Sequence, residues 1–280
     1  MSIRRARPED ADFLVGLLTH EEVEPYLSAV RPNDPESVLA GIERSQREPA
    51  EFGMFLIEVD GQPAGVMEFE CANRRSRIAH LGGLAVHPDF RGRGLSDEAA
   101  REFQRHLLLD LGYHRLQLEV YGFNDRAMRH AERVGFVREG VKRKAYRRHG
   151  EWVDGVMYAL LREDLGLSPA LDFLYEYVAR HNAGVRDGEW GLVGECFAHE
   201  AVLEFEGVAV GPFSGREAIA AAYERRPPDD EVRILDAEEE DDTVVARYAW
   251  AAAAEVEAGS LRLTREGDKI ARLVVRVSRP

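Results

Sequence analysis

The chain has 280 residues, of which 45% are hydrophobic and 31% charged, and its formal net charge at pH 7 is -14. This composition predicts a soluble protein of two domains, since a domain has roughly 150 residues. The negative charge, carried by both halves, disfavours non-specific binding to nucleic acid or to an anionic membrane surface.

The first half of the chain predicts strands and helices in alternation. Asp60-Gly61 lies between two strand-like runs and is a strong hairpin signal. The helix expected from Pro35 places Val38, Leu39 and Ile42 inward. The expected strands are Ile3–Ala6, Met54–Val59, Pro63–Cys71, Ile78–Val86, Arg115–Val120, Phe136–Ala145 and Trp152–Leu161, and the expected helices start at Pro8, Pro35, Ser96 and Asp125.

The second half predicts a small α+β unit with a curved antiparallel sheet. A boundary near Asp164–Ser168 gives domains of residues 1–166 and 167–280, because Ser168-Pro169 is typical of a helix start. Ser214-Gly-Arg-Glu217 predicts a capping box for a second helix. Strands are expected near 231–237, 243–250, 259–264 and 269–277.

The segment Leu84-Ala-Val-His-Pro-Asp-Phe-Arg-Gly-Arg-Gly-Leu-Ser96 joins a strand to a helix through a glycine-containing loop. Backbone N–H groups of such a loop, with those of the first helical turn, form an anion site. Gly92 and Gly94 allow a close backbone approach, and Arg91 and Arg93 add charge. The loop predicts a pyrophosphate site, although two glycines are equally typical of a plain strand–helix turn. The spacing is neither that of a Walker loop nor that of a dinucleotide fingerprint.

These residues carry a resemblance to a known family. Arg91-x-x-Gly94-x-Ser96 resembles the Arg/Gln-x-x-Gly-x-Gly/Ala signature of the GNAT superfamily of acyl-CoA N-acyltransferases, with Ser96 replacing the last small residue. The remaining motifs, which are similar to the subgroup of ribosomal-protein N-terminal alanine and serine acetyltransferases, are Asn124-x-x-Ala127, Gly135-Phe136, Glu139-Gly140 and Gly150-Glu-Trp-Val-Asp154. The resemblance spans about residues 1–165 and implies a mixed twisted sheet flanked by helices.

The resemblance implies acetyl-CoA as co-substrate, no metal, and a V-shaped opening between the strands that end at Val86 and Val120. The pantetheine arm would pair with the backbone of residues 84–86 as a pseudo-strand. Asn124 would bond this arm or nearby backbone, or cap a helix, or do both. The implied cofactor-binding residues are Leu84, Ala85, Val86, Arg91, Gly92, Arg93, Gly94, Leu95, Ser96, Asn124 and Ala127.

The implied reaction is direct acetyl transfer from the thioester to a primary amine, which needs a base, an oxyanion donor and an acid for the thiolate. By resemblance, the backbone N–H of Val86 or its neighbour is the oxyanion donor. His80 is the first candidate base, on a face shared with Gly82, Leu84 and Val86, and its pKa range suits proton transfer. Glu68 and Glu70, which alternate along the preceding strand, are further candidates or else a solvated face.

A tyrosine that many relatives carry as the acid falls at Ala131 here, so Tyr146 is the substitute candidate. The basic run Lys142–Arg148 either is a solvated hairpin or contacts an anion, and it argues against a polyamine acceptor.

The second half resembles the nuclear transport factor 2-like fold in its polyketide-cyclase-like branch. The matching features include Tyr175, Asn182, the run Phe197–Phe205 and Ala249-Trp250. The resemblance implies a conical sheet wrapped around a helix. The candidate pocket residues are Trp190, Glu204, Tyr223, Tyr248 and Trp250, with His199 as a further polar group. The alternative is that these aromatic residues fill the core of the cone.

Three interpretations follow. The first is an acetyl-CoA-dependent N-acetyltransferase for a small molecule, peptide or protein N-terminus, with an accessory C-terminal domain. The second is a bifunctional tailoring protein whose second pocket performs a cyclisation, hydration or isomerisation. The third is a non-catalytic acyl-CoA or metabolite sensor. No nucleic-acid or membrane partner is expected, and the second domain makes a homodimer one option.

A cytoplasmic location is expected. The charged segment Met1–Asp10 has no apolar region behind it, and no apolar stretch approaches the ~20 residues that span a bilayer. The two cysteines, Cys71 and Cys196, lie far apart, which argues against a disulfide scaffold and fits a reducing compartment.

Overall fold

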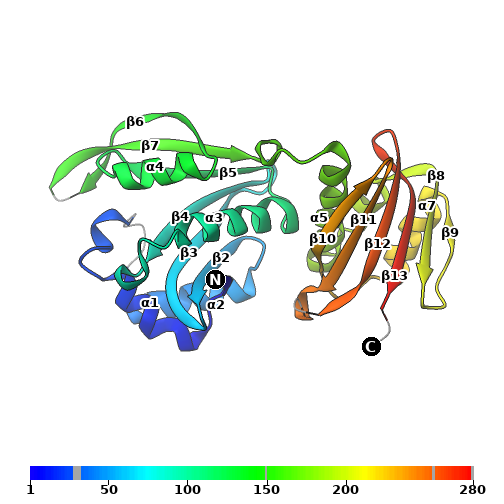
Figure 1. Cartoon of the computed structure of the whole chain (residues 1–280), viewed down its shortest axis with the longest axis horizontal. Coiled ribbons are helices and arrows are strands. Elements are labelled where there is room, and N and C mark those ends of the chain that lie inside the picture. The colour runs from blue at the N-terminus through cyan, green and yellow to red at the C-terminus, as the bar shows by residue number, and fades with distance from the viewer. Residues whose placement is uncertain (28–32, 149, 254–255, 279–280) are drawn as a thin grey trace. The chain divides into compact units, whose positions relative to one another are not determined.

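The structure is a computed structural model that describes residues 1–27, 33–148, 150–253 and 256–278. The chain forms two compact units (Figure 1). The first contains residues 1–108 and 113–164, and the second contains residues 109–112 and 165–280. Each unit has its own sheet and its own helices, in agreement with the mixed α and β composition that the sequence predicts.

The first unit is built on a seven-stranded sheet with the order β1-β2-β3-β4-β5-β7-β6. All neighbours are antiparallel except β4 and β5. The strands are β1 (Ser2–Arg5), β2 (Phe52–Val59), β3 (Gln62–Asn73), β4 (Ile78–Val86), β5 (Arg115–Tyr121), β6 (Val137–Arg148) and β7 (Glu151–Leu161). The predicted hairpin is confirmed, with Asp60 at φ 52° and Gly61 at φ 75° between β2 and β3.

In the described part of this unit, the α-helices that pack around the sheet are α1 (Ala11–Leu18), α2 (Pro35–Arg47), α3 (Leu95–Arg105) and α4 (Asp125–Arg133). In α2, Val38 and Ile42 are buried as predicted. Leu39 is exposed, because it lies at the border between the buried face of the helix and its solvent face. After α3 the chain continues as a π-helical turn over His106–Asp110, and Gly112 ends the segment with φ 71°.

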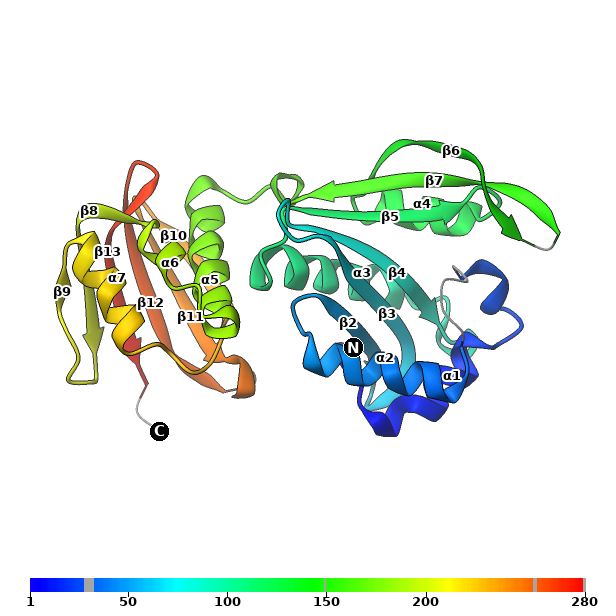
Figure 2. The same ribbon diagram turned by 180° about the vertical axis from the view of Figure 1, so that it is seen from behind.

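Strands β4 and β5 separate soon after they start. Their parallel pairing is limited to Ile78–His80 against Arg115–Gln117. Figure 2 shows the two strands starting side by side and diverging toward their carboxyl ends. This divergence leaves the facing edges of both strands without a neighbouring strand, and it creates the opening that the family resemblance implies.

An irregularity in β4 changes which residues share a face of the sheet with His80, so the prediction that Leu84 and Val86 share it is wrong. Gly82 pairs with Glu68 and Ala85 pairs with Val66, so three steps along β4 match two steps along β3. The extra residue is accommodated at Gly83, which has φ 64°. Because the alternation shifts there, Ala85 continues the face of His80, and Leu84 and Val86 lie on the other face.

The second unit is built on a six-stranded sheet with the order β10-β11-β12-β13-β8-β9. The predicted antiparallel arrangement holds for all pairs except β13 and β8, which are parallel. The strands are β8 (Phe197–Glu206), β9 (Phe213–Ser214), β10 (Val232–Glu240), β11 (Thr243–Trp250), β12 (Glu257–Glu266) and β13 (Lys269–Val277). The helices are α5 (Pro169–Asp187), α6 (Gly191–Gly194) and α7 (Arg216–Arg225).

The two predicted helix starts in this unit have different outcomes. Ser168 caps α5 by accepting a hydrogen bond from the backbone N–H of Leu171, as expected. The capping box at Ser214 is wrong, because Gly215 occupies the N-cap position without a side-chain hydrogen bond. Arg216 in the first turn instead donates to the backbone carbonyl of Phe197 at 2.8 Å, which ties α7 to β8.

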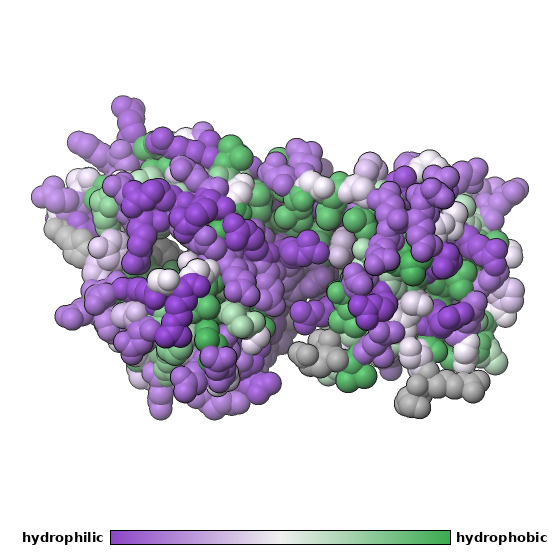
Figure 3. Space-filling view, viewed as in Figure 1, coloured by the Kyte–Doolittle hydropathy of each residue, from purple (hydrophilic) through white to green (hydrophobic). Residues whose placement is uncertain are grey.

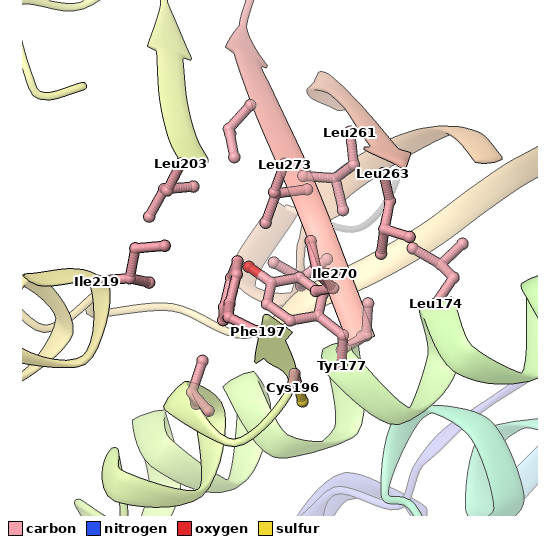
Figure 4. Packing of buried hydrophobic residues seen from close by; sticks show 14 of the residues in the cluster. Leu174, Tyr177, Cys196, Phe197, Leu203, Ile219, Leu261, Leu263, Ile270 and Leu273 are labelled. Carbon is pink, nitrogen blue, oxygen red and sulfur yellow. The ribbon is translucent and has the colours of Figure 1, made fainter. Parts of the chain in front are cut away.

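The core of the second unit lies between α5 and the sheet. Figure 4 shows Leu174 and Tyr177 of α5 facing Leu261, Leu263 and Leu273 of the strands. All of these residues are buried. Burial of this apolar surface is the main stabilising contribution, about 25 cal/mol for each Å² removed from water.

The visible surface is mainly hydrophilic on both units, with hydrophobic residues in small patches (Figure 3). Among the described residues, no helix combines the length and the apolarity that a membrane span requires.

Asn182 joins α5 to the sheet through a pair of hydrogen bonds. Its side chain is buried, its amide donates to the carbonyl of Val232, and its oxygen accepts from the N–H of Val232, both at 2.8 Å.

We expect Asn182→Ala to lower the stability of this unit by about 2–4 kcal/mol, because two buried backbone groups lose their partners. Calorimetry of the full chain measures this as a lower midpoint of one unfolding transition. The exposed Glu189→Ala is the control, and equal midpoints for the two variants would contradict the role of Asn182.

Candidate active site

A cleft of about 490 Å³ opens where β4 and β5 separate. It is lined by parts of β3, β4, β5, α3 and α4, by the segment before residue 28, and by Tyr146 of β6. Most residues that the sequence nominated line this cleft: Glu68, His80, Leu84, Ala85, Val86, Arg91, Gly92, Gly94, Leu95, Ser96, Asn124, Ala127 and Tyr146. Arg93 and Glu70 do not line it.

The loop before α3 has the geometry of an anion site. Gly92 and Gly94 have φ 81° and 75°, and a side chain added at either position would meet open space. Gly94 is the N-cap of α3, an 11-residue helix. Among the described residues, none accepts a hydrogen bond from the backbone N–H groups of residues 92–96. These donors, with the positive end of the helix dipole, therefore face a site that suits a phosphate group.

The two arginines of this loop have different positions. Arg91 donates from Nε to the carbonyl of Val86 at 3.2 Å and pairs with the carboxylate of Glu22 at 2.5 Å. Its guanidinium therefore connects the loop to the segment that precedes residue 28. Arg93 is exposed and lies 5.8 Å from the ring centre of Phe90, outside the cleft.

A charged cluster beside the loop escaped the sequence reasoning. Asp97 in the first turn of α3 accepts hydrogen bonds from Arg133 at 2.5 Å and 2.7 Å and lies 2.9 Å from Nδ1 of His130. The bonds from Arg133 hold the pKa of Asp97 well below its usual range. Burial lowers the pKa of His130. Arg133 therefore balances the carboxylate of Asp97, which would otherwise repel an anion at this helix end.

Asn124 is the N-cap of α4, where its side-chain oxygen accepts from the N–H of Ala127 at 3.1 Å. Both residues also line the cleft. The capping alternative is thus present in the structure, and a contact between Asn124 and the pantetheine arm stays a prediction.

His80 and Glu119 lie on neighbouring strands at the narrow end of the opening. The register pairs His80 with Gln117, so Glu119, two residues further along β5, extends the same face. Burial lowers the pKa of His80, and the negative charge of Glu119 opposes this effect only in part. His80 is therefore a neutral imidazole at pH 7.

Glu119 is the centre of a second cluster that the sequence did not nominate. The hydroxyl of Tyr146 and the ammonium group of Lys142 both donate to its carboxylate. Burial would raise the pKa of Glu119, but the two hydrogen bonds outweigh it and lower this pKa. Burial and the neighbouring carboxylate raise the pKa of Tyr146 to about 12. Glu119 is thus ionised and Tyr146 protonated near neutral pH.

Gly155 makes this cluster possible. Tyr146 and Lys142 belong to β6, and Glu119 belongs to β5, with β7 between them. A Cβ atom at Gly155 of β7 would lie 2.7 Å from the ring of Tyr146 and 3.2 Å from the Glu119 carboxylate. The missing side chain lets residues of β6 reach β5. The alternation of Gln117, Glu119 and Tyr121 along the strand next to His80 was the available sequence signal for Glu119.

The two glutamates of β3 differ in their surroundings. Glu68 lines the cleft next to Gly83, whose added Cβ would lie 3.1 Å from the glutamate side chain. Glu70 pairs with Arg44 of α2 at 2.7 Å and lies outside the main cleft.

In the second unit, the nominated aromatic residues lie in the core. Trp190, Tyr223 and Tyr248 are buried, and Trp190 stacks on Tyr223 with the ring centres 5.5 Å apart. Their burial fits the alternative interpretation of the sequence, in which these aromatic side chains fill the core of the cone. Trp250 is partly buried against this core.

The polar candidates of the second unit lie differently. Glu204 pairs with Arg272 at 2.8 Å, and His199 is exposed. The buried hydroxyl of Tyr248 has no hydrogen-bond partner among the described residues.

Comparison with known proteins gives two family matches. Residues 1–137 match the acetyltransferase (GNAT) domain, and residues 178–273 match the SnoaL-like domain. An uncharacterized N-acetyltransferase derived from the SPbeta prophage of Bacillus subtilis, YokL, is 28% identical over 169 residues, which are 60% of this chain and 93% of the relative. The probable N-acetyltransferase YjcK of the same organism is 29% identical over 113 residues, 40% of this chain and 62% of the relative.

Solved structures share the fold of the first unit. Spermidine N-acetyltransferase from Vibrio cholerae, in complex with CoA and spermine, has a TM-score of 0.54 at 18% identity and covers 59% of this chain and 98% of its own. Ribosomal-protein-alanine N-acetyltransferase from Brucella melitensis has a TM-score of 0.51 at 18% identity, over 57% of this chain and 99% of its own. The chain therefore carries an acetyltransferase (GNAT) domain in its first half and a SnoaL-like domain in its second half.

Proposed function

We propose that the first unit transfers the acetyl group of acetyl-CoA directly to the primary amine of a small molecule, peptide or protein N-terminus. The observation that carries this proposal is the cleft between β4 and β5. At one end lie the N–H groups of residues 92–96, which have no acceptor among the described residues, and at the other end lie His80, Glu119 and Tyr146. The cleft joins an anion site to a proton-transfer site.

The residues at the anion end fit a diphosphate. Open space at Gly92 and Gly94 allows close approach to the backbone N–H groups of the loop. Arg126 and Arg129 of α4 also line the cleft and add positive charge. Coenzyme A would supply the activated acyl group as a thioester, and the open edge of β4 at residues 84–86 would hold its pantetheine arm by backbone pairing.

His80 serves as the base in this proposal. Its neutral imidazole takes a proton from the bound ammonium, which frees the nitrogen lone pair to attack the thioester carbon. The nearby charge of Glu119 stabilises the imidazolium that results, which returns its proton to solvent. Backbone N–H groups near Val86 stabilise the oxyanion of the tetrahedral intermediate.

Tyr146 serves as the acid. Its hydroxyl keeps its proton at neutral pH because its pKa is about 12. A thiol has a pKa near 8.5, so a thiolate leaving group is less basic than the phenolate of Tyr146. Proton transfer from Tyr146 to the thiolate is therefore unfavourable in the ground state, and it occurs together with breakage of the C–S bond. The sulfur leaves as a thiol with the proton of Tyr146, and the phenolate takes the remaining N–H proton of the attacking nitrogen.

The charge of the acceptor end favours an amine that is cationic in solution. Glu68 and Glu119 line the cleft there, whereas Glu22 is paired with Arg91 of the loop before α3. Two members of the basic run that argued against a polyamine are paired with carboxylates, Lys142 with Glu119 and Arg148 with Glu24. The sequence argument against a polyamine therefore loses much of its basis.

For the second unit we propose an accessory role. The buried positions of Trp190, Tyr223 and Tyr248 support a structural use of these side chains over a second catalytic pocket. The loop and the proton-transfer groups of the first unit favour catalysis over a sensor that only binds acyl-CoA.

The anion loop gives a direct test by calorimetric titration with acetyl-CoA. We expect Gly94→Val to lower the affinity at least ~10-fold, because a β-branched residue at φ 75° distorts the loop at a cost of about 1–3 kcal/mol. Gly61→Val is the matched control, since Gly61 also has φ 75° and open space around it but lies in the β2–β3 turn. Equal affinities of the two variants for acetyl-CoA would reject the assigned anion site, and a wild-type chain without affinity would reject the proposed function.

The pH dependence tests the role of His80. Because the neutral imidazole is the active form, kcat/KM should be constant near pH 7 and fall about tenfold per pH unit below the His80 pKa, which lies under 6.5. His80→Gln should lower kcat/KM about 10²-fold or more and remove this acidic limb. The measurement uses free-thiol release with an amine found by screening. The exposed His114→Gln is the control, and an acidic limb that persists in His80→Gln would assign the base elsewhere.

A further inference from the structure

A second cavity of about 150 Å³ adjoins the cleft on the side of α2. The two spaces share Leu27, Glu68, His80, Gly82 and Gly83 among their lining residues. The cavity therefore opens beside the proposed base, at the end of the cleft opposite the anion loop. Nothing in the reaction proposed above uses this space.

The lining of the cavity is partly apolar. Val38 of α2 and Phe52 and Met54 of β2 line it, and all three are buried. The polar lining residues are Asn33, Ser37, Glu68, Glu70 and His80. Ser37 donates its hydroxyl to Asp34 at 2.9 Å, and Glu70 pairs with Arg44 at 2.7 Å. The part of the wall that α2 and β2 form therefore suits an apolar group.

The size of the cavity limits its occupant. A space of about 150 Å³ has room for a ring the size of benzene. A branched alkyl group or a phenyl ring thus fits. Gly41 contributes to this space because it has no side chain, and a Cβ atom there would lie 3.0 Å from the terminal methyl of Met54.

The charge at the entrance identifies which substrate enters. Glu68 and His80 lie at the junction of the two spaces. A carboxylate attracts an ammonium group and repels the carbonyl oxygen of a thioester. Resting on the proposed function, we propose that the cavity receives the apolar substituent of the acceptor amine, so that the acceptor is a primary amine with a compact branched or aromatic side group.

A series of amino-acid amides tests this assignment, because glycinamide, valinamide, leucinamide and phenylalaninamide differ only in the side group. With acetyl-CoA and a free-thiol readout, we expect kcat/KM of the wild type to rise ~10-fold or more from glycinamide to leucinamide. Gly41→Leu fills the cavity and should lower the ratio of leucinamide to glycinamide at least ~10-fold. Ala40→Leu adds the same side chain at the preceding, exposed helix position and should leave the ratio unchanged.

A second variant guards against misfolding of Gly41→Leu. Val38→Ala enlarges the cavity and should move the preference from leucinamide toward phenylalaninamide. Calorimetric titration with acetyl-CoA is carried out for every variant, so that loss of the fold is recognised as loss of this binding.

Three outcomes overturn the inference while the proposed function stands, provided that the wild type binds acetyl-CoA. The first is equal rates for all amides, and the second is no turnover of any amide. The third is that Gly41→Leu changes the preference between acetyl-CoA and butyryl-CoA and leaves the preference among amides unchanged. A wild type that neither binds acetyl-CoA nor releases thiol rejects the proposed function itself.

Discussion

The site depends on the point at which β4 and β5 stop pairing. Three residues of each strand are in register, and beyond His80 and Gln117 the strands diverge. Backbone N–H and C=O groups that leave a sheet need other partners, because an unpaired buried polar group is costly. An extended ligand between the strands can supply them. The glycine at position 83 supports this arrangement by inserting an extra residue into β4 with φ 64°.

Charge is distributed unevenly along the opening. Arg126 and Arg129 lie on α4 near the loop before α3, and Glu68 and Glu119 lie toward the other end. This polarity orients an anionic cofactor and a cationic amine toward opposite ends of one cleft. Two ionised carboxylates, Asp97 in the first turn of α3 and Glu119 on β5, each have a cationic partner. Asp97 pairs with Arg133, and Glu119 pairs with Lys142. Because these pairs are local, neither Asp97 nor Glu119 is left without a cationic partner.

Local signals in the sequence were sufficient for the turns and for the backbone conformation of the loop before α3. Asp60-Gly61 and Gly94 require positive φ, and Ser168 caps the next residues of the chain, so a few neighbouring residues determine each feature. The predicted strand alternation failed at Gly83, where one inserted residue exchanged the two faces of β4. Gly82-Gly83 is a local signal of a bulge, but the partner strand defines which residue is inserted.

The contacts across the sheet could not be predicted from single strands. Glu119, Tyr146 and Lys142 meet only because the strand order places β7 between β5 and β6, and because Gly155 lacks a side chain. The pairing in the second unit could not be predicted for the same reason, because β8 pairs in parallel with β13, which follows much later in the sequence. Its aromatic residues were visible as candidates, but their use as core or as pocket lining depends on how α5 packs against the sheet.

The most direct measurement of the central claim is a crystal structure of the full chain grown with coenzyme A. The account predicts the diphosphate within hydrogen-bond distance of the backbone N–H groups of residues 92–96 and the pantetheine arm between β4 and β5. Coenzyme A bound elsewhere on the chain, with protein side chains filling the space between the two strands, would contradict it.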